Sequence, residues 1–212
     1  MTPILAFDIE TIPDCDGIRK VYELPAELPD ADAAEVAFQR RRVQTGASDF
    51  LPNHLHRVVV ISCVLRSDDG VRIFSVGEPQ EAEAGAIQRF FDGMEKYVPQ
   101  LVTWNGRNFD LPVLVARGMV HGVRAACFWE TGGESKYNNY VNRFHDRHLD
   151  LMDVLSIYGG RGSPLDELSR LAGFPGKLGV GGGAVWESYR AGQVEAIRNY
   201  CEADTVNTYL LF

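Results

Sequence analysis

The sequence has few cysteines, no long apolar run and a shortage of positive charge. Its apolar runs, such as VVVISCVL, are too short to span a bilayer, and acidic residues stand near the N-terminus, where a signal peptide would be basic. The four cysteines are Cys15, Cys63, Cys127 and Cys201, and no two of them form a CxxC pair. This spacing argues against a zinc site or a disulfide framework and fits a reducing compartment. We therefore expect a cytoplasmic protein without a membrane segment and with structural cysteines.

The formal net charge of −8 argues against a protein that coats duplex nucleic acid through bulk positive potential. It leaves open an enzyme that holds one nucleic-acid end through metal ions bound to its own carboxylates. With 212 residues, 45% of them hydrophobic, the chain is long enough to bury a sizeable core. We expect a single domain over residues 1–212.

Apolar patterning predicts strands and helices in mixed order along the chain. A stretch rich in glycine, asparagine and tyrosine, residues 123–148, is predicted to be a long loop, and long loops in compact domains are often functional. Strands are predicted over residues 3–9, 56–67, 71–76 and 100–105, the second and third forming a hairpin, and helices within 23–43, 81–98, 109–122, 163–173 and 193–212. This order predicts an α/β domain with a central sheet flanked by helices.

The stretch LAFDIETIP places Asp8 and Glu10 inside an apolar run. Side chains two apart in a strand share a face, so the two carboxylates would emerge side by side. Two like charges about 4 Å apart repel by roughly 4 kcal/mol at an effective dielectric near 20. The pair therefore suggests a bound metal ion, although these residues alone leave open a strand-end cap at Asp8 with Glu10 in solvent.

Two further motifs carry carboxylates. In VTWNGRNFDLPVL, Asp110 follows a predicted strand and opens a helix, where helix capping explains it as well as a functional role does. In YCEADTVNTYLL, Tyr200 and Asp204 lie four apart on a predicted helix and share a face, which is either solvated or directed at one site. Neither motif is specific when taken alone.

Taken in order, FDIET, NGRNFD and YxxxD closely resemble the three motifs of the DEDDy 3′–5′ exonucleases, in the ribonuclease H-like (DnaQ-like) superfamily. That superfamily includes ribonuclease D and the proofreading domains of family B DNA polymerases. The wording TWNGRNFDLPVL and YCEADTVNTYLLF is most similar to stand-alone bacterial exonucleases related to the polymerase B proofreading domain. The resemblance spans Asp8 to Asp204, nearly the whole chain.

The resemblance implies a ribonuclease H-like fold with a central mixed sheet of five or six strands flanked by helices. It also implies that Asp8, Glu10, Asp110 and Asp204 ligate two divalent metal ions, and that Tyr200 positions the attacking water. Ligation by carboxylates alone suits hard Mg²⁺ or Mn²⁺. Two such ions about 3.5–4 Å apart can hold the attacking and the leaving oxygens of a phosphodiester.

Candidate substrate contacts follow from the same resemblance. Thr11 and Ile12, just past Glu10, are expected near the terminal sugar, and Asn105 near the terminal nucleotide. Phe109 offers a base-stacking surface. Apart from the resemblance, the glycine-rich stretch GKLGVGGGA, residues 176–184, is predicted to be a flexible loop in which Lys177 is a candidate phosphate contact.

A second pattern competes for the third motif. His145 and Asp150 fit the HxxxxD spacing of the sister class of exonucleases, but they precede a strand-like segment. We assign the third motif to Tyr200 and Asp204, because their helix falls where the family's third motif belongs.

The sequence therefore predicts a metal-dependent enzyme that removes nucleoside 5′-monophosphates from the 3′ end of a single strand, of DNA rather than RNA. Two alternatives stay open. One is an RNA-trimming enzyme similar to ribonuclease D, and the other is a non-catalytic nucleic-acid-binding module of the same fold.

Overall fold

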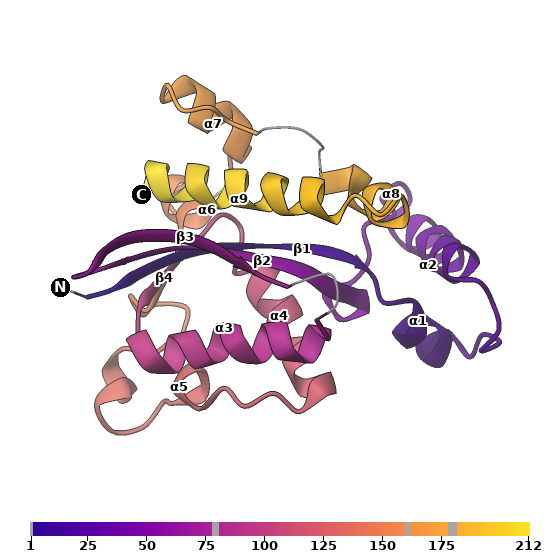
Figure 1. Ribbon diagram of the computed structural model, residues 1–212, viewed down its shortest axis with the longest axis horizontal. Coiled ribbons are helices and arrows are strands. Elements are labelled where there is room, and N and C mark those ends of the chain that lie inside the picture. Colours follow the sequence, from indigo (N-terminus) through magenta and orange to yellow (C-terminus); the bar gives the residue numbers. More distant parts are fainter. Residues whose placement is uncertain (1, 78–80, 160–161, 178–181) are drawn as a thin grey trace.

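The computed structural model describes residues 2–77, 81–159, 162–177 and 182–212, and its central element is a five-stranded sheet (Figure 1). The strand order is β3-β2-β1-β4-β5, with β1 antiparallel to β2, β2 antiparallel to β3, and β4 and β5 parallel to β1. The strands are β1 (Ile4–Pro13), β2 (His56–Ser67), β3 (Gly70–Val76), β4 (Gln100–Thr103) and β5 (His148–Asp150). The prediction of a mixed sheet in an α/β fold is confirmed, with five strands.

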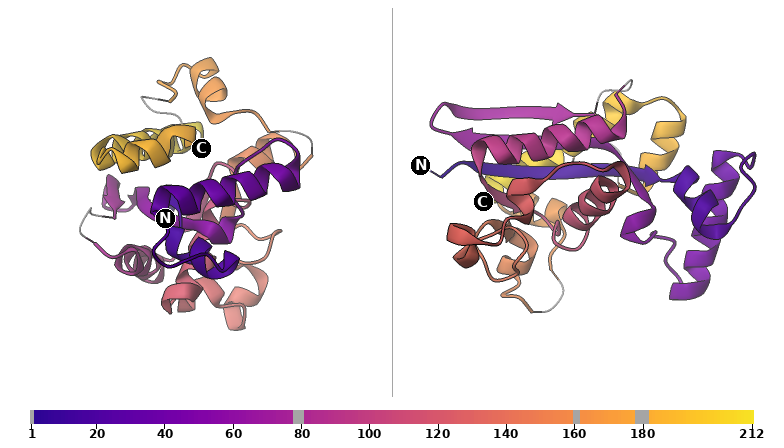
Figure 2. Two further views of the ribbon diagram at one scale, coloured as in Figure 1. Left: turned by 90° about the vertical axis from the view of Figure 1, so that its right-hand side faces the viewer. Right: turned by 90° about the horizontal axis from the view of Figure 1, so that it is seen from below.

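Helices cover both faces of the sheet (Figures 1 and 2). One face carries α3 (Glu83–Tyr97), α4 (Asp110–His121) and α5 (Ala126–Trp129). The other carries α6 (Leu151–Leu155), α7 (Leu165–Leu171), α8 (Val185–Arg190) and α9 (Val194–Leu211). Beyond the C-terminal end of β1 lie α1 (Cys15–Tyr22) and α2 (Asp30–Thr45), and short 3₁₀ turns occupy Asn53–Leu55, Gly133–Tyr137 and Gly182–Ala184.

The alternation of β1 decides which way its acidic residues face. Leu5, Phe7 and Ile9 pack into the core on the α3 and α4 side. Ile4 and Ala6 pack on the opposite side, in a cluster with α9 side chains. Because successive strand residues point to opposite faces, Asp8 and Glu10 are directed toward α9.

A β-bulge follows Glu10. Glu10 pairs with Val60 of β2, whereas Thr11 pairs with Val58, so the register shifts between them. The Val58 amide donates to Glu83 Oε1 (2.7 Å), and Arg117 Nε donates to the same oxygen (2.8 Å). Bulges redirect side chains and are common beside active sites, and this one is held by a buried ion pair between α3 and α4.

The structure differs from the sequence prediction in its short elements. β1 runs four residues beyond its predicted end, because it stays paired with β2 as far as His56. Neither α1 nor α8 is predicted: α1 buries just Cys15 and Ile18, and α8 has six residues, too few for a helical period to show. The predicted loop 123–148 contains α5 and a 3₁₀ turn. Residues 178–181 of the predicted loop 176–184 lie outside the described part of the chain.

The hairpin of β2 and β3 and the predicted helices α2, α3, α4, α7 and α9 are confirmed. Within the described residues, no helix is both long and apolar enough to cross a membrane.

Candidate active site

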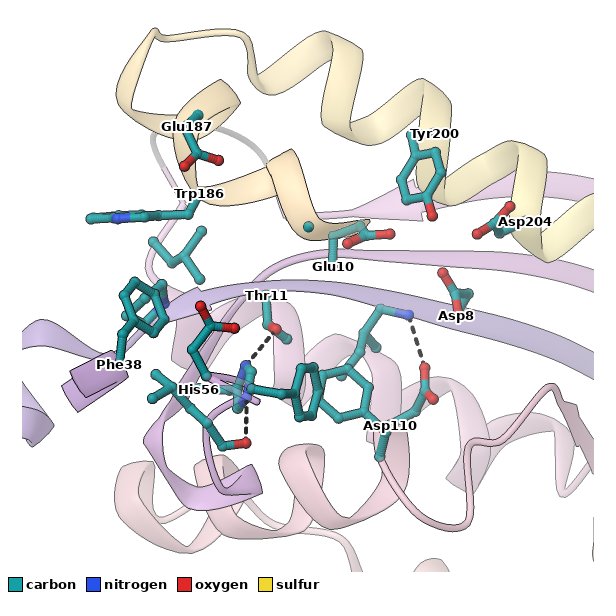
Figure 3. A pocket seen from close by; sticks show the side chains of 18 of the residues that line it. Asp8, Glu10, Thr11, Phe38, His56, Asp110, Trp186, Glu187, Tyr200 and Asp204 are labelled. Carbon is teal, nitrogen blue, oxygen red and sulfur yellow. Dashed lines mark hydrogen bonds between the residues drawn. The ribbon is translucent and has the colours of Figure 1, made fainter. Parts of the chain in front are cut away.

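A pocket of about 820 Å³ opens beside the second half of β1 (Figure 3). It is bordered by the start of α4, by α9 and by α8. Its lining includes all the residues that the sequence predicts for the site: Asp8, Glu10, Thr11, Ile12, Asn105, Phe109, Asp110, Lys177, Tyr200 and Asp204. Segments from both ends and the middle of the chain thus meet at one place.

The carboxylates of Asp8 and Glu10 lie on one face of β1, as the strand alternation predicts. One ligand atom from each, together with the Cys201 sulfur of α9, lie within 4.8 Å of one another. Cys201 Sγ donates to the Asp8 backbone oxygen (3.4 Å) and to Asp8 Oδ2 (3.6 Å). Burial raises the pKa of the Cys201 thiol well above its usual range, so this sulfur stays a protonated donor to Asp8.

Asp110 joins this pair from the first residue of α4. Its side chain is buried (3% exposed), and its Oδ1 accepts a hydrogen bond from the Ile9 amide (3.1 Å; Figure 3). Ile9 stands between Asp8 and Glu10 on β1. The bond therefore fixes the start of α4 against the part of the strand that carries both carboxylates.

Tyr200 and Asp204 come from successive turns of α9, and both face the pocket (Figure 3). Lys177 Nζ donates to the Tyr200 hydroxyl oxygen (2.6 Å) and pairs with Asp204 Oδ2 (3.0 Å). The position of Lys177 is set by its backbone neighbourhood: its amide donates to Asp166 Oδ1 (2.7 Å), and Asn207 of α9 brackets Gly176 with two hydrogen bonds. A phosphate was the predicted partner of Lys177, whereas the structure pairs it with the tyrosine and an acidic residue.

The pocket concentrates negative charge at low exposure. Burial, together with repulsion from Asp110, Glu10 and Asp204, raises the pKa of Asp8 well above its ordinary value. Burial and repulsion from Asp204 raise the pKa of Glu10 to about 8, against the opposing attraction of Lys177. Burial also raises the pKa of Asp110 to about 7 and increases the pKa of Asp204. Four ionised carboxylates in this pocket need more cationic charge than Lys177 supplies.

The donor set fits hard divalent cations. The four carboxylates offer oxygen ligands, which Mg²⁺ and Mn²⁺ prefer. Asp204 Oδ1 is buried and has no hydrogen-bond partner among the described residues, although buried polar atoms are normally paired. The pocket therefore contains a carboxylate cluster that could hold a metal ion, with ligand atoms of Asp8 and Glu10 within 4.8 Å of each other.

The loop between β4 and α4 presents Asn105 and Phe109. Asn105 has a left-handed backbone (φ 63°), and its amide donates to Asp150 Oδ1 (2.9 Å), while the Arg107 amide donates to Asp150 Oδ2 (2.9 Å). The Phe109 ring lies 5.1 Å from that of His56, edge to face. Asp150, which the sequence places in a competing motif, thus acts as the anchor of this loop.

His56 fixes the hydroxyl of Thr11. Its Nε2 lies 3.1 Å from the Leu51 carbonyl, which can only accept, so Nε2 carries the proton and Nδ1 accepts from Thr11 Oγ1 (2.8 Å; Figure 3). Burial lowers the pKa of His56, which keeps the ring neutral.

His145 and Asp150 do not line the pocket, whereas Tyr200 and Asp204 do. His145 Nδ1 accepts from the Asn139 amide instead (2.9 Å). Sequence reasoning missed Cys201 and Asn207. Both lie three residues from Asp204, so helical spacing on α9 is a signal that points to them.

A mixed five-stranded sheet with a carboxylate pocket beside its central strand is the arrangement of the ribonuclease H-like exonucleases. A family model described as "Predicted 3′-5′ exonuclease related to the exonuclease domain of PolB" matches residues 48–212, and the chain belongs to this family. It is therefore an exonuclease, an enzyme with a nucleic-acid substrate. The comparison with curated proteins found no match. The matched range begins after β1, so the placement of Asp8 and Glu10 beside the other carboxylates comes from the structure alone.

Proposed function

We propose that this exonuclease hydrolyses the last phosphodiester at the 3′ end of single-stranded DNA and releases nucleoside 5′-monophosphates. The observation that carries the proposal is the meeting of Asp8, Glu10, Asp110 and Asp204 with Tyr200 in one pocket. The choice of DNA over RNA rests on the relation of the family to the PolB exonuclease domain.

In this proposal the four carboxylates hold two divalent metal ions, Mg²⁺ or Mn²⁺. When bound, the ions would supply positive charge at the attacking and leaving oxygens. The unpartnered Asp204 Oδ1 and the raised pKa values of Glu10 and Asp110 support this assignment, since Lys177, which pairs with Asp204 Oδ2, balances the charge of the cluster only in part.

In this proposal Tyr200 orients the water molecule that attacks the phosphodiester. Lys177 Nζ donates to the hydroxyl oxygen, and burial raises the pKa of Tyr200 above its ordinary value even though that hydrogen bond opposes the rise. The phenol therefore keeps its proton, which it can donate to a water oxygen. This role is one of orientation and not of proton removal.

The reaction breaks one bond and forms one. The water oxygen attacks phosphorus, and the bond from phosphorus to the 3′ oxygen of the preceding nucleotide breaks. That oxygen takes up a proton and becomes the new 3′ hydroxyl, while the proton lost by water passes to solvent. Asn105 and Thr11 hold the terminal nucleotide, and Phe109 and Ile12 form the apolar wall beside it.

The test is a cleavage assay on matched DNA and RNA oligonucleotides labelled at the 5′ end, with Mn²⁺ or with EDTA. We expect a ladder that shortens from the 3′ end of DNA and disappears with EDTA. Faster shortening of RNA would replace the DNA assignment with an RNA-trimming activity. Intact substrates of both kinds would overturn the proposed reaction.

A further inference from the structure

The pocket continues past the carboxylates toward α2 and α8. At the end far from Asp204, Phe38 of α2 and Trp186 of α8 line it (Figure 3). Its volume of about 820 Å³ lies in the upper part of the range of about 300–1,000 Å³ that single small ligands fill. The pocket therefore has room for more than a terminal nucleotide.

The far wall is built by α8 and by the segment between β1 and β2. These strands are antiparallel neighbours, which a turn of a few residues can join, yet here the connection is long enough to contain α1 and α2. The two helices enclose a small core of their own, in which Ala33, Ala34 and Ala37 are fully buried. Phe38 and Trp186 are half-buried against this core, so both rings are held in place.

Further aromatic rings line the same pocket. The Phe50 ring is 5.3 Å from that of Phe109 and 5.2 Å from that of His56, and all three line the pocket. Phe50 is 55% exposed in spite of being apolar. Bases stack on such rings regardless of sequence, because every base has a π-face.

The Arg42 guanidinium at this end is already engaged by acidic side chains. Arg42 pairs with Glu35 (2.6 Å) and with Asp49 (2.9 Å), and both acidic residues line the pocket as well. Arg190 lies 5.8 Å from the Trp186 ring centroid, and the neighbouring Glu187 is exposed. A groove that followed phosphates would present several cations without acidic partners, and Arg42 is not one of them, so this end is suited to bases more than to phosphates.

We propose that Phe38 and Trp186 bind unpaired bases of the substrate strand by stacking. This inference rests on the proposed function, and it names single-stranded DNA of several nucleotides as the substrate. A duplex hides its base faces within the stack, so a paired end gains little from these rings.

The test compares Phe38→Leu and Trp186→Leu with the wild type. Leucine keeps an apolar side chain against the α1–α2 core and removes the aromatic face. Phe144→Leu and Trp129→Leu are matched controls, because these rings are exposed (87% and 51%) and do not line the pocket. Two readouts are made with Mn²⁺: cleavage of a DNA octamer against a dinucleotide, and anisotropy binding of a phosphorothioate octamer that resists hydrolysis.

In each pocket variant, we expect the ratio of the octamer cleavage rate to the dinucleotide cleavage rate to fall about fivefold or more. We expect the affinity for the octamer to fall by a similar factor. The controls leave both quantities at the wild-type values. The affinity of the wild type for the octamer should fall no more than about tenfold when salt is raised from 50 to 200 mM. A protein that contacts two phosphates of a single strand is expected to lose about sevenfold in affinity over this range.

The outcomes separate this inference from the proposed function. If both pocket variants cleave and bind the octamer as well as the wild type does, the proposed stacking role is wrong, while the proposed exonuclease reaction is unaffected. Octamer binding that weakens in both variants, with no cleavage by the wild type, would support the surface and overturn the reaction. A thousandfold loss of affinity with salt, or no octamer binding by the wild type, would also overturn stacking by these rings.

Discussion

Asp150 holds the loop that carries Asn105 and leads into Asp110, and Asp150→Asn tests this role. Its Oδ1 accepts from the Asn105 amide (2.9 Å) and the Met152 amide (3.1 Å), and its Oδ2 accepts from the Arg107 amide (2.9 Å). Asn105 has a left-handed backbone, which is uncommon outside glycine although asparagine adopts it more readily than most residues. We predict that the variant folds but loses both stability and catalytic efficiency.

The magnitude follows from the lost hydrogen bonds. An asparagine side chain turns an NH₂ group toward at least one of the backbone amides, and a hydrogen bond to a charged acceptor contributes about 1.5–3 kcal/mol. We expect the free energy of unfolding to fall by about 2 kcal/mol. A shift of about 1 Å at a reacting group costs on the order of 100-fold in rate, so a partly released loop should lower kcat/KM by about tenfold or more.

The assay is urea unfolding together with turnover of 5′-labelled DNA under conditions where the variant is fully folded. Asp153→Asn is the matched control, because its contact with Arg107 is long (3.6 Å) and both side chains are partly exposed. That control should change the free energy of unfolding by less than about 1 kcal/mol. Wild-type kcat/KM in Asp150→Asn would refute the idea that Asp150 holds the loop in its working position.

Three further predictions follow from other contacts. Lys177→Met removes the donor to the Tyr200 hydroxyl and should lower kcat about tenfold in steady-state cleavage, with a smaller effect on KM. Burial lowers the pKa of His148 to about 3, from about 6.5 in the unfolded chain, so its stabilisation is complete above pH 6.5 and is lost as the pH falls toward 3. Between pH 7 and pH 5 the wild type should lose about 2 kcal/mol more than His148→Gln does in urea unfolding. Arg117→Met leaves the Glu83 carboxylate buried without its guanidinium and should reduce the free energy of unfolding by about 3–5 kcal/mol, measured by the same method.

Each of these three predictions has a result that would contradict it. Lys136→Met, which alters an exposed lysine outside the pocket, should keep wild-type kcat, and an equal loss there would remove the special role of Lys177. Parallel pH profiles for the wild type and His148→Gln would show that His148 titrates normally in the folded state. A change below about 1 kcal/mol in Arg117→Met would mean that solvent reaches Glu83.

Sequence patterns predicted the features that depend on local geometry. Strand alternation places Asp8 and Glu10 on the same face of β1, and helical spacing places Tyr200 and Asp204 on the same face of α9. Both rules hold in the structure, because a buried strand and a long helix follow their ideal periods closely. The order of the motifs identified the exonuclease family, which the family comparison bears out.

Features that depend on tertiary contacts were out of reach. The ion pair of Lys177 with Asp204 spans two separate segments, and the anchoring of Asn105 by Asp150 joins residues 45 positions apart. The wall of Phe38 and Trp186 needs α8, a helix too short to give a periodic signal. In each case the partner is chosen by the packing of elements and not by the sequence around the residue.

The central claim is that residues from three distant segments form one site for two divalent metal ions. Titration of Mn²⁺ followed by electron paramagnetic resonance tests this claim directly, with the wild type and Asp204→Asn side by side. The account predicts two bound Mn²⁺ per chain in the wild type, and fewer or weaker sites in the variant. No saturable binding in the wild type, or identical binding in the two proteins, would contradict it.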